Sequence, residues 1–229
     1  MVYHNPLNRH DVGDLVHDGY DGYLYLLPSE YLELCALGDY TIQYDLEFAA
    51  STGGGMVMAP KFYAPEATAS GSNANRPHYL AARFNKNGTF QHTIRVSGGT
   101  YQTVGASESS TSLLATLFPE ATSVVGQKMT VRIEMLVKDS DADTDWGYNV
   151  YVKPEGASEW EFVSSYNTSA TYAYYYNDET KLAGDALAMV VLTGSQFYVD
   201  NIAVWTGTGG APEANTEIYE VLRAAYNSK

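Results

Sequence analysis

The stretch "QFYVDNIAVW", residues 196–205, decides the fold, because its apolar alternation changes phase partway along. Apolar residues stand at odd positions before its centre and at even positions after it: Phe197, Val199, Ile202 and Val204. Asp200 and Asn201 lie between the two pairs. Successive residues of a strand face opposite sides, so an uncorrected slip of one residue turns half of these side chains into water. A chain that keeps this pattern must correct the slip at Asp200–Asn201.

Several other segments carry the alternation of half-buried strands. In "YTIQYDLEF", residues 40–48, apolar residues alternate with polar ones, and "MTVRIEMLV", residues 129–137, follows the same plan. Shorter candidate strands, separated by turn signals, lie at 22–27, 55–59, 79–84, 89–96, 148–152, 160–165 and 187–192. Strands with one polar and one apolar face predict an all-β fold, a two-sheet antiparallel β-sandwich.

The end of the chain departs from this pattern. "TGTGGA", residues 206–211, reads as a linker, and "PEANTEIYEVLRAAY", residues 212–226, has the only helical spacing of apolar residues. We therefore expect a sandwich domain over residues 1–206, followed by a linker and a short C-terminal helix over residues 207–229.

The negative net charge of the chain argues against some classes of binding partner. The chain has 13 Lys and Arg against 27 Asp and Glu, a net charge of −14. Nucleic acid and anionic lipid both require positive potential, so neither is an expected partner. No apolar run approaches the roughly 18 residues of a membrane span, so membrane insertion is not expected either.

Five segments in order support a resemblance to a known group: "DYTIQYDLEF", "YLAARFNKNGTF", "GQKMTVRIEML", "GYNVYVK" and a closing "FYVDNIAVW". In this order the chain resembles the concanavalin A-like lectin/glucanase superfamily, in its laminin-G-like jelly-roll branch. The resemblance implies two curved antiparallel sheets and a concave face that often takes carbohydrate. It also suggests how the phase change is corrected, by a β-bulge at Asp200–Asn201.

The same resemblance implies a structural Ca²⁺. In many sugar-binding relatives an Asp of the last strand helps to hold calcium near the N-terminal segment, which here gives Asp200 with Asp11 or Asp18 as its partner. In the alternative interpretation, Asp200 only caps loop amides. A second calcium candidate is "DSDADTD", residues 139–145, whose alternating carboxylates suit Ca²⁺ although the Gly and Glu of an EF-hand are missing.

Catalytic motifs are incomplete in this sequence. Gln43, Asp45 and Glu47 resemble the catalytic strand of family 16 glycosidases, but Gln43 stands where the carboxylate nucleophile is required. Gln91 and His92 are adjacent, whereas alginate lyases of this fold separate the two by one residue. We therefore predict no catalytic residue.

A glycan site would combine stacking rings with hydrogen-bonding side chains, because sugars present C–H faces and hydroxyls. Arginine and carboxylate residues on predicted strands, together with aromatic residues after turns or in the Tyr-rich segment 170–178, are the candidates: Arg83, Arg132, Glu134, Trp146, Tyr151 and Tyr174. The competing interpretation is that these rings belong to the core or to ordinary sheet faces.

The function predicted first is a non-catalytic carbohydrate-binding or adhesin-type module of a larger secreted or cell-surface protein, bacterial in origin, with neighbouring domains in the same chain. The alternatives are a glycoside hydrolase or polysaccharide lyase of the same fold, and a structural domain of a surface or fibre assembly. Paired carboxylates in a groove favour the enzyme, aromatic residues without such a pair favour the binder, and a flat polar face favours the structural domain.

Overall fold

The computed structural model describes residues 2–5, 10–11, 22–27, 39–50, 56–63, 78–85, 87–95, 102–103, 111–137, 146–167, 186–191 and 196–210. The predicted C-terminal helix, the Asp-rich segment 139–145, Asp18 and Tyr174 lie outside these ranges.

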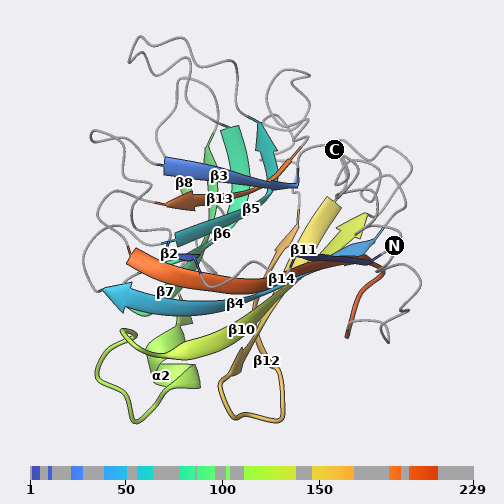
Figure 1. Cartoon of the computed structure of the whole chain (residues 1–229). Helices are drawn as coiled ribbons and strands as arrows, with labels where there is room; N and C mark the ends of the chain where they lie inside the picture. Colours follow the sequence, from blue (N-terminus) through green and yellow to red (C-terminus); the bar gives the residue numbers. More distant parts are fainter. Residues whose placement is uncertain are drawn as a thin grey trace, which may run out of the picture.

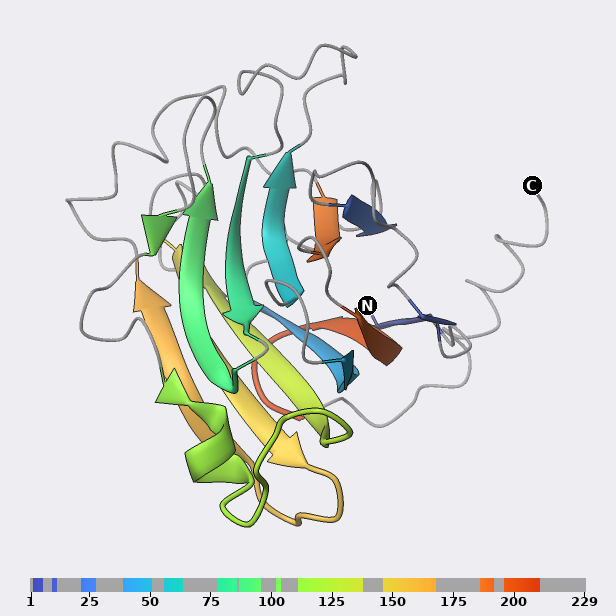
Figure 2. The same cartoon turned by 90° about the vertical axis from the view of Figure 1, so that its left-hand side faces the viewer.

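Two antiparallel sheets face each other, as Figures 1 and 2 show. Sheet 1 has the strand order β1 (Val2–Asn5), β14 (Gln196–Thr206), β4 (Tyr40–Ala50), β10 (Lys128–Val137), β11 (Trp146–Pro154) and β12 (Glu161–Asn167), with β2 (His10–Asp11) also paired to β14. Sheet 2 has the order β3 (Gly22–Leu27), β13 (Ala186–Val191), β5 (Met56–Tyr63), β6 (His78–Phe84), β7 (Thr89–Arg95) and β8 (Gln102–Thr103), with β9 (Thr111–Ser112) paired to β7. The predicted all-β sandwich is confirmed.

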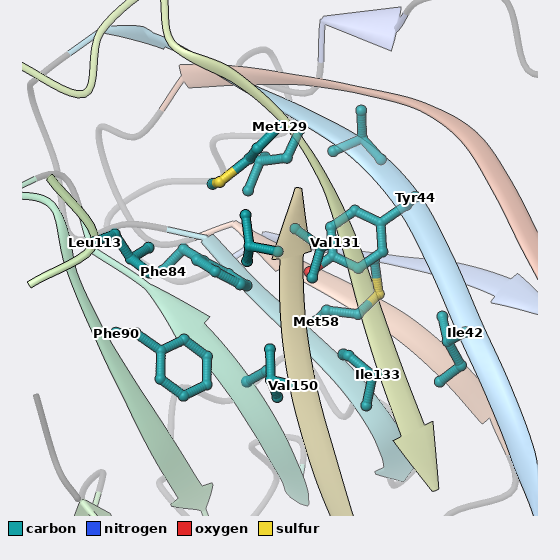
Figure 3. Packing of buried hydrophobic residues seen from close by; sticks show 14 of the residues in the cluster. Ile42, Tyr44, Met58, Phe84, Phe90, Leu113, Met129, Val131, Ile133 and Val150 are labelled. Atoms are coloured by element: carbon teal, nitrogen blue, oxygen red, sulfur yellow. The ribbon is translucent and has the colours of Figure 1, made fainter. Parts of the chain in front are cut away.

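The core lies between the two sheets, and Figure 3 shows side chains from both pointing into it. Sheet 1 supplies Ile42 and Ile133, each with no exposed surface. Sheet 2 supplies Met58, Phe84 and Phe90, which are equally buried. The inward residues of β4 and β10 fall at alternate positions, so the period-two pattern in the sequence predicted this face correctly.

The phase change in β14 is a β-bulge at Asp200–Asn201, as predicted. Asp200 faces Asp45 in the ladder with β4, whereas Ala203 faces Gln43, so β14 takes three steps where β4 takes two. Asn201 accommodates the extra step with φ of 51°, in the left-handed region that Asn enters more readily than most residues. The four apolar side chains on both sides of the bulge are each at most 3% exposed: Phe197, Val199, Ile202 and Val204.

A second bulge, which the sequence did not predict, lies in β12 at Val163. Tyr151 of β11 faces Phe162, whereas its neighbour Val150 faces Ser164, so Val163 is the extra residue. As a result, Phe162 lies on the outer face with 56% of its surface exposed, while Ser164 is buried on the inner face.

A short helix, α2 (Leu113–Leu117), closes one end of the core and was not predicted. Figure 2 shows it at the same end of the molecule as the β11–β12 turn. The helix packs on the β6–β7 turn, where the amide of Leu113 donates to the carbonyl of Gly88 at 2.5 Å. A Cβ added at Gly88, whose φ is 77°, would lie 2.8 Å from Cβ of Leu114, so only glycine fits this contact.

Candidate functional site

The outer face of sheet 1 carries the polar residues that alternate with its core residues. On β4 and β10, the strands at its centre, these residues are Gln43, Asp45, Glu47, Thr130, Arg132 and Glu134. Their positions follow from the register, since a residue directly opposite another in an antiparallel ladder shares its face.

One part of this face is a groove of about 350 Å³ over β14, β4 and β10. Its lining residues are Asp45, Leu46, Glu47, Lys128, Met129, Thr130, Glu155, Tyr198 and Asp200. Four of these carry carboxylates and one carries an amine, and Lys128 Nζ lies 3.6 Å from Glu155 Oε1. The groove is therefore acidic, with hydroxyl groups from Thr130 and Tyr198.

Asp45 is held in a fixed orientation at the centre of the groove. The hydroxyl of Thr130 donates to its Oδ1 at 2.7 Å, and the side-chain amide of Asn201 donates to its Oδ2 at 2.7 Å. The bulge that orders Asn201 also places Asp200 directly opposite Asp45. The backbone amide of Asn201 donates to Asp200 Oδ1 at 2.8 Å. Together with the two bonds to Asp45, this bond offsets the repulsion between the two carboxylates.

Next to the groove lies an aromatic patch, which we define as Tyr151, Trp160 and Phe162 with Arg132 and Lys153. The guanidinium carbon of Arg132 lies 4.3 Å from the centroid of the Trp160 ring and 5.1 Å from that of Tyr151. Lys153 Nζ lies 5.3 Å from the Trp160 ring, and the rings of Tyr151 and Phe162 meet edge to face at 5.6 Å. Cation–π contacts of this kind contribute about 0.5–2 kcal/mol each, so the patch is preformed.

Local sequence explains how the patch is built. Tyr151 belongs to the outward set of β11, between two fully buried valines. The β11–β12 turn contains Gly156 with φ of 81° and is fastened by the amide of Glu155, which donates to the carbonyl of Lys128 at 3.0 Å. This turn delivers Trp160 over Arg132, and the bulge at Val163 then keeps Phe162 on the outer face.

The structure brings together three of the six predicted sugar-binding residues. Arg132 and Tyr151 belong to the patch, and Glu134 Oε1 lies 3.2 Å from Arg132 Nε. Glu134 is only 7% exposed, because it also accepts a hydrogen bond from the amide of Gly209 at 3.0 Å. In the structure it therefore contacts protein groups, and its contact with a sugar stays a prediction.

The other three predicted residues are placed differently. Arg83 alternates with the buried Ala82 and Phe84 on β6, so it lies on the outer face of sheet 2, away from the patch. Trp146 opens β11 opposite Val137, and its side chain lies outside the described residues, as does all of Tyr174.

Phe162 was not among the candidate rings, and Trp160, which follows a turn-rich segment, was not one of the six predicted residues. The alternation of Trp160, Glu161 and Phe162 in the sequence already places both rings on one side of an extended chain. The contacts of Asn201 and Thr130 with Asp45 had no comparable signal, since Asn201 and Asp45 are 156 residues apart.

The predicted calcium ligands lie on neighbouring strands. Asp11 of β2 faces Tyr198 of β14, two residues before Asp200. The side chain of Asp11 is outside the described part. Within the described residues, no three Asp, Glu, His or Cys side chains gather as a metal-binding group.

A buried polar cluster joins the two sheets behind the patch. His92 of β7 is hydrogen-bonded through Nδ1 to the hydroxyl of Tyr148 at 2.7 Å and through Nε2 to the hydroxyl of Ser164 at 2.9 Å. Burial lowers the pKa of His92 to about 4, so the ring is neutral at pH 7. With His92 only 1% exposed, these groups tie the sheets together and are closed to a substrate.

No family model matches the sequence, and no curated protein matches it. The comparison with solved structures does find similar chains. The Ca²⁺- and Man3GlcNAc-bound exoplasmic/lumenal domain of VIP36 is 8% identical over 84% of this chain and 76% of that one, with a TM-score of 0.46. Alginate lyase vAL-1 from Chlorella virus is 10% identical over 74% of this chain and 72% of that one, with a TM-score of 0.35.

A third match is the binding domain of botulinum neurotoxin serotype D/C, 5% identical over 82% of this chain and 38% of that one, with a TM-score of 0.42. The chain thus spans well under half of that protein. All three TM-scores are below 0.5, and we therefore base the function on this chain's own side chains. In the part of the chain that the structure describes, no helix has the length and apolar character needed to cross a membrane.

Proposed function

We propose that this chain is a non-catalytic carbohydrate-binding module whose ligand lies on the outer face of sheet 1, over the aromatic patch and the adjoining groove. The observation that carries the proposal is the patch itself, in which Phe162 is 56% exposed beside Tyr151 and Trp160. Rings stack on the C–H faces of sugars, and the carboxylates and hydroxyls of the groove suit sugar hydroxyls.

The charge distribution favours a neutral or weakly charged glycan. The groove carries Asp45, Glu47, Glu155 and Asp200 against Lys128, and the whole chain has a net charge of −14. A polyuronate or a sulfated glycan would meet negative potential at the groove. The groove and the patch share strand β10, so one oligosaccharide can reach both.

Titration calorimetry against xylan, glucan, mannan and pectin fragments tests this proposal. We expect dissociation constants between micromolar and millimolar, which correspond to about 4–8 kcal/mol. Phe162→Ala should weaken binding about tenfold, because it removes the most exposed ring at the site. Glu161→Ala, at the exposed neighbour in the same strand, is the matched control and should bind as the parent does. The absence of heat with every fragment would favour a structural domain of a surface or fibre assembly.

A glycoside hydrolase or polysaccharide lyase is the second candidate, and the groove is the specific observation that favours it. Asp45 and Glu47 lie on one face of β4, and Asp200 lies opposite Asp45. A retaining hydrolase needs two carboxyl groups about 5 to 5.5 Å apart. Incubation of the same fragments with reducing-end detection separates the candidates, since turnover abolished by Asp45→Asn or Glu47→Gln would establish the enzyme.

Calcium remains part of the proposal, with Asp200 and Asp11 as its ligands. A metal bound only by the folded state would stabilise it by about 2.7 kcal/mol at 100 times its dissociation constant. We expect EDTA to lower the melting temperature of the parent protein and not that of Asp200→Ala. A melting curve unchanged by EDTA would remove calcium from the account.

The setting that suits this function is a secreted or cell-surface bacterial protein with further domains in the same chain. An exposed site with few desolvated contacts binds weakly, and neighbouring modules would raise the effective affinity by avidity. Cell fractionation of the source organism, followed by immunodetection of this chain, tests the location; recovery in the cytoplasm alone would contradict it.

A further inference from the structure

Glu134 is a buried carboxylate on the otherwise solvent-facing side of β10, with a side chain only 10% exposed. We propose that Glu134 is a positioning residue that couples the aromatic patch to the turn formed by residues 207–210. This inference rests on the proposed function for its ligand, but the link between Glu134, Arg132 and the turn stands on contacts within the protein.

The first half of the link is the ion pair with Arg132. The two side chains lie on the same face of β10, with Arg132 Nε 3.2 Å from Glu134 Oε1, and the Arg132 side chain is 12% exposed. The contact is an ion pair by distance, and the buried Arg132 Nε has no hydrogen-bond partner among the described residues. A guanidinium beneath the rings of Tyr151 and Trp160 has lost much of its water, so an anion beside it stabilises this placement. Glu134 thereby fixes the cation around which the patch is arranged.

The second half of the link is the turn after β14. The amide of Gly209 donates to the same Oε1 atom at 3.0 Å. Two further bonds hold the turn on the sheet: the amide of Gly207 donates to the carbonyl of Asp39 at 2.6 Å, and the hydroxyl of Thr41 donates to the carbonyl of Gly207 at 2.7 Å. One oxygen atom therefore joins the patch to the chain leaving the sheet.

A shared atom makes the two contacts interdependent. If the turn leaves the sheet, the Glu134 side chain becomes more exposed to solvent and more mobile, and its ion pair with Arg132 weakens. Because coupling between two binding events is reciprocal, a glycan that orders Arg132 must also favour the docked turn. The coupling would let whatever follows residue 210 influence glycan affinity, and let the glycan influence that segment.

Gly209→Ala tests the coupling, and Gly126→Ala is its matched control. Gly209 has φ of 96° and Gly126 has φ of 79°, and a Cβ at either position meets no atom within 4 Å. Alanine therefore strains both turns without a clash, but only Gly209→Ala loosens the contact with Glu134. Glu134→Gln keeps an oxygen for Gly209 and removes the charge beside Arg132, and Glu134→Ala removes both.

The first readout needs no ligand and is the exchange of the Arg132 Nε–H proton, followed by NMR in the intact chain. Among the described residues this buried N–H has no hydrogen-bond partner, so its exchange reports how well the surrounding contacts keep it from water. We expect exchange at least about threefold faster in Gly209→Ala than in the parent, unchanged exchange in Gly126→Ala, and a rise from parent to Glu134→Gln to Glu134→Ala. Equal exchange in Gly209→Ala and Gly126→Ala would overturn the coupling.

The second readout is the exchange of the Gly209 amide with and without the xylan, glucan, mannan and pectin fragments. A fragment that binds should slow this exchange in the parent, and Gly209→Ala should raise its dissociation constant about threefold or more. A bound fragment that leaves the Gly209 amide unchanged would contradict the coupling. If no fragment binds, the proposed function fails, and the Arg132 measurement still decides the link.

Discussion

Two bulges of sheet 1, one in β14 and one in β12, correct the same geometric problem with opposite chemistry. In β14 the extra step falls at Asp200–Asn201 and is taken by a polar residue in the left-handed region, whose amide then holds Asp45. In β12 the extra residue is Val163, which packs against the core. Each bulge leaves the inner face apolar or hydrogen-bonded while a polar or aromatic side chain lies on the outer face.

The difference lies in what each bulge delivers to the outer face. The β14 bulge orders carboxylates and an amide, and so builds the acidic groove. The β12 bulge keeps Phe162 exposed next to Tyr151, and so builds the aromatic patch. The bulges of β14 and β12 thus give one sheet an acidic, hydrogen-bonded part and an aromatic part, and β10 joins them.

Deleting one residue from a regular strand should have the largest effect. Deletion of Thr130 from β10 throws the buried residues on one side of it out of phase, and each one exposed costs about 1.5–3 kcal/mol. Deletion of Asn201 removes only the extra residue of the bulge, so both apolar pairs of β14 still face the core. We expect the Asn201 deletion to retain a cooperative urea transition by circular dichroism and the Thr130 deletion to lose it. Loss of folding in both would contradict the bulge in β14.

Acid should destabilise the fold by protonating His92, which is hydrogen-bonded to Ser164 of β12. The pKa of His92 is lowered from 6.5 to about 4 in the folded chain, so the stability that this imparts is present above pH 6.5 and is lost as the pH falls towards 4. Between pH 7 and pH 4.5 we expect a loss of about 2–3 kcal/mol from this group, measured by urea unfolding. His92→Gln keeps all the other titratable groups, so its unfolding free energy should fall less between pH 7 and pH 4.5 than that of the parent. An equal fall in the two proteins would show that His92 is not the group responsible.

Substitutions of Asn201 in the β14 bulge should lower the free energy of unfolding by a smaller amount, which depends on the backbone conformation that the new residue allows. Asn201→Ala loses the hydrogen bond to Asp45 and puts a side chain without polar groups at φ of 51°, at a cost of about 1–2 kcal/mol. Asn201→Gly loses the same bond but tolerates the backbone, so it should cost less than about 1 kcal/mol. Denaturation midpoints in urea give both values, and a glycine variant less stable than the alanine variant would show that the backbone conformation is not the cause.

The smallest effect on stability is expected at the exposed ring of the β12 side. Phe162→Ala should change the unfolding free energy by no more than about 0.5 kcal/mol, because the ring is largely in water already. The same variant should bind glycan about tenfold more weakly. A large loss of stability in urea would show that the ring belongs to the core and would weaken the case for a stacking surface.

The sequence predicts a bulge where apolar residues lie on both sides of it. Phe197 and Val199 before the β14 bulge, with Ile202 and Val204 after it, reveal the slip by their positions alone. In β12 the segment after Val163 continues with serines, so no second apolar pair marks the change of phase. The strands β1 and β2 are too short to carry an alternation of their own, and the helix α2 has barely more than one turn.

The site was predicted in part for a similar reason. The hairpin of β10 and β11 follows from two adjacent alternating segments, and its register brings Arg132 beside Tyr151. The placement of Trp160 depends on the shape of the β11–β12 turn, and the burial of Glu134 depends on a turn that the sequence indicated as a linker. Both are tertiary contacts that period and composition do not encode.

A glycan-array screen measures whether the outer face of sheet 1 binds sugar. The intact chain and Phe162→Ala are compared on the same array of neutral and acidic glycans, each with and without EDTA. The account predicts that the parent binds neutral glycans, that Phe162→Ala loses most of this binding, and that EDTA reduces it only if calcium supports the fold. Binding to acidic glycans alone, or undiminished binding by Phe162→Ala, would contradict the assignment of the glycan site to this face of sheet 1.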